Sequence, residues 1–99
     1  MIKHIVLFQL KDELTQEQRA EVMNTFKAGI EQLPAVITEI VDISVNFNCN
    51  EAEAWDICLE STFASMADLE TYAQHPDHKA VGAALRPHMA ARSCVDYEC

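Results

Sequence analysis

The residues best suited to chemistry lie close together in the run Tyr72-Ala73-Gln74-His75-Pro76-Asp77-His78. A histidine with an ordinary pKa of about 6.5 can take a proton from carbon or oxygen. A phenol can donate a hydrogen bond to a developing oxyanion. Tyr72 and His78 could therefore support enolisation, aldol closure or isomerisation without a cofactor. The alternative is structural, because a hydrogen bond between the Tyr72 hydroxyl and His78 would fix a break between two helices.

Two further histidines, His4 and His75, are weaker candidates. His4 shares a predicted strand face with Val6 and Phe8. It is either a satisfied core residue or, if it faces Tyr72, a third polar group in an apolar pocket. His75 precedes a proline, which disfavours helical backbone at that position, so we expect it to satisfy backbone groups at the break. No metal site is expected in this run, because the proline leaves the ligand directions unspecified.

Other charged residues are interpreted as determinants of assembly or ligand orientation. Asp56 and Glu60 lie on the polar side of a predicted strand. We expect them at a dimer seam or near solvent, and at a seam a carboxylate could pair with Lys3 of either subunit. Arg92, if it points with Cys94 toward the helices, could orient a carboxylate-bearing ligand.

Length and composition predict one domain that pairs with a second copy of itself. The chain has 99 residues, and 49% of them are hydrophobic, a surplus that we expect to cover a partner subunit in a homodimer. Its net charge of −9 repels phosphate backbones and anionic membranes, so neither nucleic acid nor membrane is an expected partner. No apolar run approaches the ~18 residues that span a bilayer, and the apolar start is too short for a signal segment. A cytoplasmic location is therefore expected.

The four cysteines show no C-x-x-C spacing, so neither a zinc site nor a thioredoxin motif is expected. In a cytoplasmic protein they should be reduced thiols. Cys58 and Cys94 lie inside strand patterns and are expected to behave as small apolar residues. Cys49 and Cys99 could be exposed, and whether they pair is left open.

Hydrophobic periodicity predicts the elements that must position these groups. Thr15, with Gln18 three residues later, predicts the start of a helix that Pro34 ends. Ser65 predicts the start of a second helix, and Pro76 both breaks it and begins a third that extends over residues 77–90. Strands are predicted over residues 2–10, 37–47, 54–63 and 92–98.

The resulting order, βαββαβ, predicts an α+β fold: a ferredoxin-like sandwich with a four-stranded antiparallel sheet, formed by residues 1–99 as a single domain. The helices would cover one face of the sheet. The opposite face carries Ile5, Leu7 and Cys58 and needs cover. Dimerisation of sheet against sheet would supply that cover and form a dimeric α/β barrel.

Several short motifs carry a resemblance to a known family over essentially the whole chain. They are Ile2-Lys3-His4-Ile5-Val6-Leu7-Phe8, Lys11-Asp12, Pro34, Asp56, Thr62-Phe63-x-Ser65, Tyr72-x-x-His75-Pro76-x-His78 and Asp96-Tyr97. With these motifs the chain resembles the stress-responsive dimeric α/β-barrel (Dabb) domain family. The resemblance implies a homodimer whose two sheets face each other, with a cavity in each subunit between helices and sheet.

The resemblance also implies roles for individual residues. A plant member of the family closes a linear polyketide by aldol condensation with a tyrosine–histidine pair. Its tyrosine falls on Tyr72, its catalytic histidine on His78 and a further pocket histidine on His4. The proton-transfer pair is thus retained.

The pocket lining departs from that relative. A third-strand histidine is replaced by Ile57, and a bulky tryptophan by Met89. Two apolar positions of the last strand are occupied by Arg92 and Cys94. Polyketide specificity is therefore not carried over to this chain.

We interpret the sequence as a small homodimeric barrel protein that binds a small, partly apolar molecule near Tyr72, His78 and His4, with no cofactor and no metal. The first alternative is a cofactor-independent acid–base enzyme of the cyclase or isomerase type, with His78 as base and Tyr72 as oxyanion partner. Others are a structural or stress-protective dimer and a cofactor-free monooxygenase. The expected pocket walls are Val6, Phe8, Phe26, Ile57, Leu59 and Met89.

Overall fold

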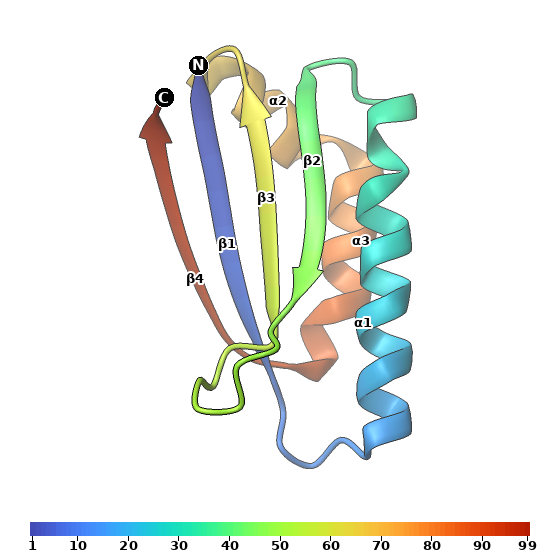
Figure 1. The fold of residues 1–99 in the computed structure, drawn as a ribbon. Helices are drawn as coiled ribbons and strands as arrows, with labels where there is room; N and C mark the ends of the chain where they lie inside the picture. Colours follow the sequence, from blue (N-terminus) through green and yellow to red (C-terminus); the bar gives the residue numbers. More distant parts are fainter.

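A computed structural model describes residues 1–99 as a four-stranded antiparallel sheet with helices on one face (Figure 1). The strand order is β2-β3-β1-β4, which confirms the predicted ferredoxin-like α+β fold with its second helical segment split. None of the helices combines the length and the apolar character needed to cross a membrane. The elements are β1 (Ile2–Leu10), α1 (Gln16–Glu31), the 3₁₀ helix η1 (Leu33–Ala35), β2 (Ile40–Phe47), β3 (Ile57–Phe63), α2 (Met66–Gln74), α3 (Pro76–Leu85), the 3₁₀ helix η2 (Arg86–His88) and β4 (Met89–Glu98).

Strand β1 lies inside the sheet, hydrogen-bonded to β3 on one edge and β4 on the other. Its even-numbered side chains, from Ile2 to Leu10, are all buried against the helices, and the odd-numbered ones from Lys3 to Gln9 are half-buried on the other face. This pattern follows from the two-residue period of a strand. The predicted central strand with apolar residues on both faces is confirmed.

The helix-facing side of the sheet packs against α1, α2 and α3 in one hydrophobic core. Helix α1 begins with the predicted capping box, in which Thr15 accepts from the Gln18 backbone and the Gln18 side chain accepts from the Thr15 backbone. The core consists of Ile2, Val6, Phe8, Leu10, Phe26, Ile30, Leu33, Ile37, Ile40, Val45, Ile57, Leu59, Phe63, Leu69, Tyr72 and Leu85.

Four predicted boundaries were wrong. Strand β4 begins at Met89 rather than at residue 92, because Met89 still pairs with Leu10 beyond a register shift. The third helix ends at Leu85 rather than at residue 90, because Pro87 lacks the N–H that a continuing α-helix needs. The strand expected from residue 37 begins at Ile40, and a register shift beside Val41 leaves that side chain 50% exposed. The strand expected from residue 54 begins at Ile57.

The expected pairing of Asp56 with Lys3 is not found within the subunit. The Asp56 carboxylate lies 3.1 Å from the Arg19 guanidinium and accepts the Leu10 backbone N–H at 2.7 Å. Asp56 precedes β3 and ties the end of β1 to the beginning of α1. The charge of Asp56 is therefore paired with Arg19 of the same subunit.

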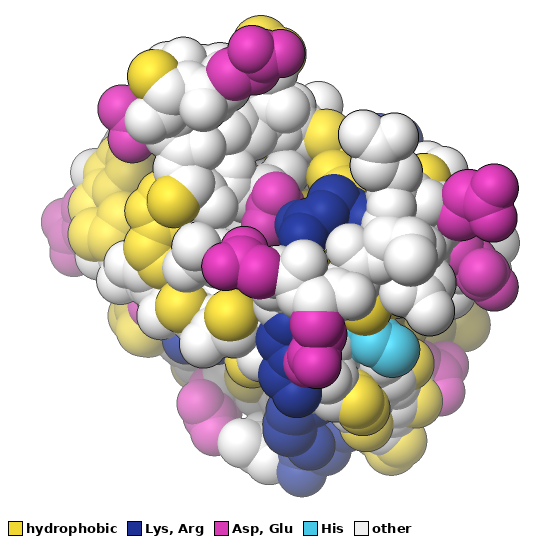
Figure 2. Space-filling view, turned by 90° about the horizontal axis from the view of Figure 1, so that it is seen from below, with side chains coloured by type: hydrophobic (Ala, Val, Ile, Leu, Met, Phe, Trp, Pro, Cys, Tyr) yellow, Lys and Arg dark blue, Asp and Glu magenta, His cyan; other side chains and the backbone are white.

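The sheet face opposite the helices remains partly apolar, as predicted. Ile5, Leu7 and Cys58 are half-buried there. Val95 and Tyr97 of β4, which pair with residues 5 and 3 of β1 and so share that face, are 54% and 48% exposed. At one end of the molecule, Figure 2 shows acidic side chains scattered around a small group of Lys and Arg side chains.

Gly29 lets α1 and α3 approach each other closely. A Cβ at this position would lie 3.1 Å from Cγ2 and 3.3 Å from Cγ1 of Val81 on α3, whereas a Cβ at Gly82 would meet nothing within 4 Å. Both glycines lie in helix interiors, where alanine is favoured by roughly 0.8–1 kcal/mol.

We therefore expect Gly82→Ala to raise the free energy of unfolding by about 0.5–1 kcal/mol. Gly29→Ala should gain less than this or lose stability, because Val81 must move to admit the methyl group. Urea denaturation of the two variants and the wild type measures the difference. Equal gains in both variants would show that Val81 can move away from a methyl group at position 29 without loss of stability.

Candidate functional site

A cavity of about 540 Å³ lies between the helix layer and the β1–β4 side of the sheet. Tyr72 and His78 lie on its helix side, and His4 lies on its sheet side. Its walls are formed by His4, Val6, Phe8, Phe26, Ile30, Leu59, Met66, Leu69, Glu70, Tyr72, Ala73, His78, Gly82, Leu85, Arg86, Met89, Arg92, Cys94 and Asp96. Five of the six expected wall residues are among these, and the sixth, Ile57, is not. Ile57 is 1% exposed at the start of β3, where core side chains cover it.

The helix break has the origin that the sequence predicts. His75 has extended backbone angles, φ −63° and ψ 133°, and Pro76 is the first residue of α3. The His75 Nδ1 accepts the Asp77 backbone N–H at 3.1 Å and so caps α3. The predicted role of His75 as a corner residue that satisfies backbone is confirmed.

The break also determines how His78 is held. In a continuous helix the Asp77 N–H would bond the Ala73 carbonyl, four residues earlier. Here that N–H goes to His75, and the Ala73 oxygen lies 3.1 Å from His78 Nδ1 instead. Nδ1 must carry the proton in this contact, because a carbonyl can only accept. The other ring nitrogen, Nε2, is then the basic one.

Burial lowers the pKa of His78, and the nearby His4, Arg92 and His75 lower it further, while the hydrogen bond to Ala73 opposes them. The neutral form is therefore favoured near neutral pH. A neutral imidazole with a free Nε2 lone pair is the state that a general base requires.

Tyr72 is 1% exposed, and its buried hydroxyl has no hydrogen-bond partner. The ring centroids of Tyr72 and His78 are 4.3 Å apart with planes inclined at 46°, but no hydrogen bond joins the two side chains. The structural alternative, a Tyr72–His78 hydrogen bond, is not formed. Burial raises the pKa of Tyr72 far above its usual range, against the opposing effect of Arg92. The phenol therefore stays protonated as a hydrogen-bond donor.

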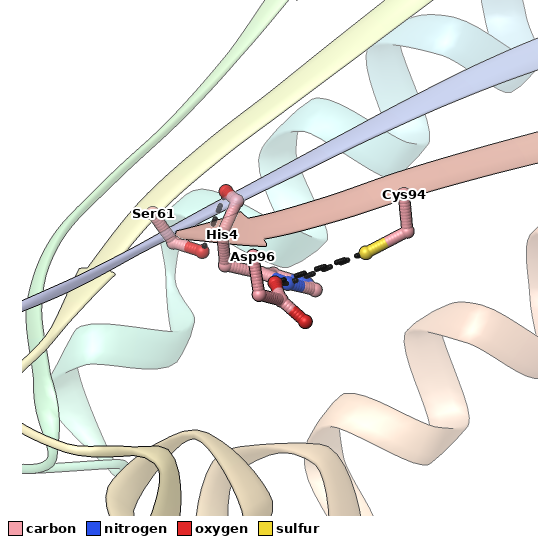
Figure 3. Close-up of polar contacts among 4 residues, drawn as sticks. All are labelled: His4, Ser61, Cys94 and Asp96. Atoms are coloured by element: carbon pink, nitrogen blue, oxygen red, sulfur yellow. Dashed lines mark hydrogen bonds and ion pairs between the residues drawn. The ribbon is translucent and has the colours of Figure 1, made fainter. Parts of the chain in front are cut away.

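His4 completes the polar lining from the sheet. Its ring centroid lies 6.3 Å from that of Tyr72, and its Nδ1 binds the Asp96 carboxylate, which lies opposite it on β4. Figure 3 shows both side chains on the helix side of the sheet, with the Cys94 thiol directed toward them. The buried Ser61 hydroxyl donates to the His4 carbonyl at 3.5 Å. His4 is thus both a satisfied residue and a cavity residue.

Cys94 and Asp96 differ from expectation. Cys94 was predicted to be a small apolar strand residue, but it is exposed and its Sγ lies 3.7 Å from His4 Nδ1 and 3.8 Å from the Asp96 carboxylate. Burial and the Asp96 charge raise the pKa of this thiol, and Arg92 opposes them. Asp96 was not among the expected site residues. The sequence feature that could have identified Asp96 is its even-numbered position, which puts it on the same face of β4 as Arg92.

The lowered pKa of His78 makes stability depend on pH. Because protonation is easier in the unfolded chain, where the pKa is about 6.5, stability falls as pH drops below that value toward the folded-state pKa. We expect the free energy of unfolding to decline between about pH 7 and 5, and the decline to be smaller in His78→Gln. Urea titrations across this range measure both slopes. An unchanged slope in His78→Gln, with His88→Gln as the control for loss of an imidazole, would contradict the assignment.

Comparisons with known proteins place this geometry in a family. The family model of the stress responsive A/B barrel domain matches residues 2–99. Olivetolic acid cyclase of Cannabis sativa is 27% identical over 97% of this chain and 94% of its own length. A dimeric protein of unknown function from Bacteroides fragilis with a ferredoxin-like fold is 47% identical, with a TM-score of 0.97 over 99% of this chain and 95% of that one. Hydroxynitrile lyase from Passiflora edulis, 20% identical with a TM-score of 0.75 over 97% of this chain and 90% of its own, shares the fold. The chain belongs to the stress-responsive A/B barrel (Dabb) domain family.

Proposed function

We propose that the protein binds a small, partly apolar carbonyl compound in the cavity and transfers a proton on it without a cofactor. The carrying observation is the buried, unpartnered Tyr72 hydroxyl beside a histidine whose lowered pKa favours the neutral form. A buried donor with no partner costs about 1–3 kcal/mol. A ligand oxygen that accepts from it would recover much of this cost, so the hydroxyl is a natural anchor for a carbonyl.

The proposed reaction begins with abstraction of a proton by His78. His78 Nε2 takes a proton from the carbon next to the carbonyl, and the electron pair of that C–H bond forms the enolate. Charge develops on the carbonyl oxygen, to which the Tyr72 hydroxyl donates. If the compound has a double bond next to the ionised carbon, the conjugated enolate can regain the proton from His78 at the far carbon of that bond, which is isomerisation. Otherwise the enolate carbon attacks a second carbonyl, and the alkoxide so formed takes the proton back from His78, which is aldol closure. Arg92 on the cavity wall offers a cation for a ligand that also carries a carboxylate.

The cavity walls support a ligand of mixed polarity. Twelve of the 19 lining residues are hydrophobic, and the polar ones gather around Tyr72 and on β4. Such a distribution is typical of sites that bury an apolar body and orient a few polar atoms. The similarity to a protein named as a cyclase supports the same class of chemistry.

We propose further that the protein is a homodimer in which two sheets face each other. The open sheet face is partly apolar, and the solved relatives include proteins described as dimeric and ferredoxin-like. A cytoplasmic location is proposed from the four free cysteines.

Tyr72→Phe tests the reaction. We expect it to slow deuterium exchange next to the carbonyl by about 100- to 1,000-fold, the usual cost of one oxyanion donor. The rate is measured by NMR with a panel of short and medium-chain ketones and beta-diketones. Tyr97→Phe, which changes the other tyrosine on the opposite sheet face, is the matched control and should retain the wild-type rate.

The same variant separates catalysis from a structural role. Removing a buried hydroxyl that has no partner should leave the free energy of unfolding unchanged or raise it. If the hydroxyl served to hold the helix break, Tyr72→Phe would lower stability by about 1 kcal/mol. Wild-type exchange rates in Tyr72→Phe would sink the catalytic proposal.

Val95→Lys tests the dimer. A lysine on the open sheet face would bury a charge against the partner sheet, so we expect the molecular mass in solution to fall to that of a monomer at micromolar concentration. Val36→Lys, at a valine directly after η1 with 53% exposure against 54% for Val95, is the matched control. Analytical ultracentrifugation distinguishes the two masses. A dimer that survives Val95→Lys but not Val36→Lys would place the interface elsewhere.

A further inference from the structure

His4, Cys94 and Asp96 form a compact set of three different metal-ligand types on the sheet wall of the cavity (Figure 3). Cys94 and Asp96 are two residues apart on β4 and point to the same face. His4 lies directly opposite Asp96 on β1, so its side chain joins that face. Their ligand atoms, one nitrogen, one sulfur and one carboxylate oxygen, all lie within 4.8 Å of one another.

The separations suit a tetrahedral divalent ion. Zinc binds sulfur at about 2.3 Å and nitrogen or oxygen at about 2.0–2.2 Å, which sets ligand atoms about 3.3–3.7 Å apart. Cys94 Sγ lies 3.7 Å from His4 Nδ1 and 3.8 Å from Asp96 Oδ1. The third pair of ligand atoms, His4 Nδ1 and Asp96 Oδ1, is joined by a hydrogen bond. These two atoms must move apart to admit an ion. Asp96 has room to move, because its side chain is 29% exposed.

We propose that His4 Nδ1, the Cys94 thiolate and the Asp96 carboxylate bind Zn²⁺, with the fourth coordination position open to the cavity. Thiolate and imidazole are ligands that zinc prefers, and sites with three protein ligands leave a position for water or substrate. On binding, the ion takes the place of the proton between Nδ1 and Asp96, the imidazole stays neutral with its one proton on Nε2, and the proton of the thiol is released to solvent.

Charge also supports a divalent cation here. The thiolate and the carboxylate supply two negative charges that neutralise Zn²⁺, and the chain carries a net charge of −9. The opposing group is Arg92, two residues before Cys94, which shares the cavity wall and lowers the pKa of the thiol. Its positive charge should weaken cation binding. We therefore expect substitution of Asp96 to weaken zinc binding and substitution of Arg92 to strengthen it.

This inference goes beyond the proposed proton transfer and does not depend on it. Tyr72 and His78 lie on the helix side of the cavity and contribute no ligand to the set. Metal binding is measured directly, so the result is independent of any enzymatic activity.

Cobalt(II), which substitutes for zinc and is coloured, is the first probe. We expect the wild type to show a near-ultraviolet thiolate-to-cobalt charge-transfer band that Zn²⁺ abolishes by displacement. Cys94→Ser should lose the band, and Cys58→Ser should keep it, because Cys58 lies on the opposite sheet face. Absence of the band in the wild type, or its loss in Cys58→Ser and not in Cys94→Ser, would overturn the proposal.

Zinc affinity by competition with a coloured chelator is the second measurement. Asp96→Asn should weaken binding by at least about 10- to 100-fold, the loss usual for even an outer partner of a ligand. Arg92→Ala should strengthen it. Circular dichroism confirms that each variant is folded, and Zn²⁺ should raise the melting temperature of the wild type but not of Cys94→Ser. Equal affinities in wild type and Asp96→Asn would overturn the assignment of this ligand.

Discussion

The pairing of β1 with a strand on each of its edges is the interaction on which the rest of the structure depends. It places β1 inside the sheet, so that its even-numbered side chains are buried under the helices and its odd-numbered ones lie half-buried on the open face. It also sets the register that brings His4 opposite Asp96 on one side and Ser61 on the other. A slip of β1 by one residue would turn His4 to the open face and remove its imidazole from the cavity.

The helix break has a comparable effect on the opposite wall. Pro76 cannot donate a backbone hydrogen bond, and His75 takes the Asp77 N–H that a continuous helix would use for Ala73. The released Ala73 carbonyl then accepts from His78 and fixes which ring nitrogen carries the proton. Chain geometry at one proline thus selects the protonation pattern of a side chain two residues later.

Sequence reasoning succeeded where the signal is local. The capping box at Thr15, the break at Pro76 and the two-sided pattern of β1 depend on neighbouring residues, and all three are found. It failed where the outcome depends on distant pairing. The contact between His4 and Asp96 joins positions 92 residues apart, and only the β1–β4 register reveals it. The lack of a hydrogen-bond partner for the Tyr72 hydroxyl could not be predicted from the sequence either, because it depends on how the surrounding side chains pack.

The two walls of the cavity are electrostatically coupled, and this coupling makes the proposed proton transfer compatible with the proposed metal site. The pKa of His78 is lowered in part by His4 and Arg92, which act across the cavity. A divalent cation bound beside His4 would add positive charge on the same wall. It would lower the pKa of His78 further and favour its neutral form. An anionic ligand would act in the opposite direction, unless Arg92 neutralised it. His4 on β1 and Arg92 on β4 therefore influence the pKa of His78 from the sheet wall, and through it the proton transfer proposed for the helix wall.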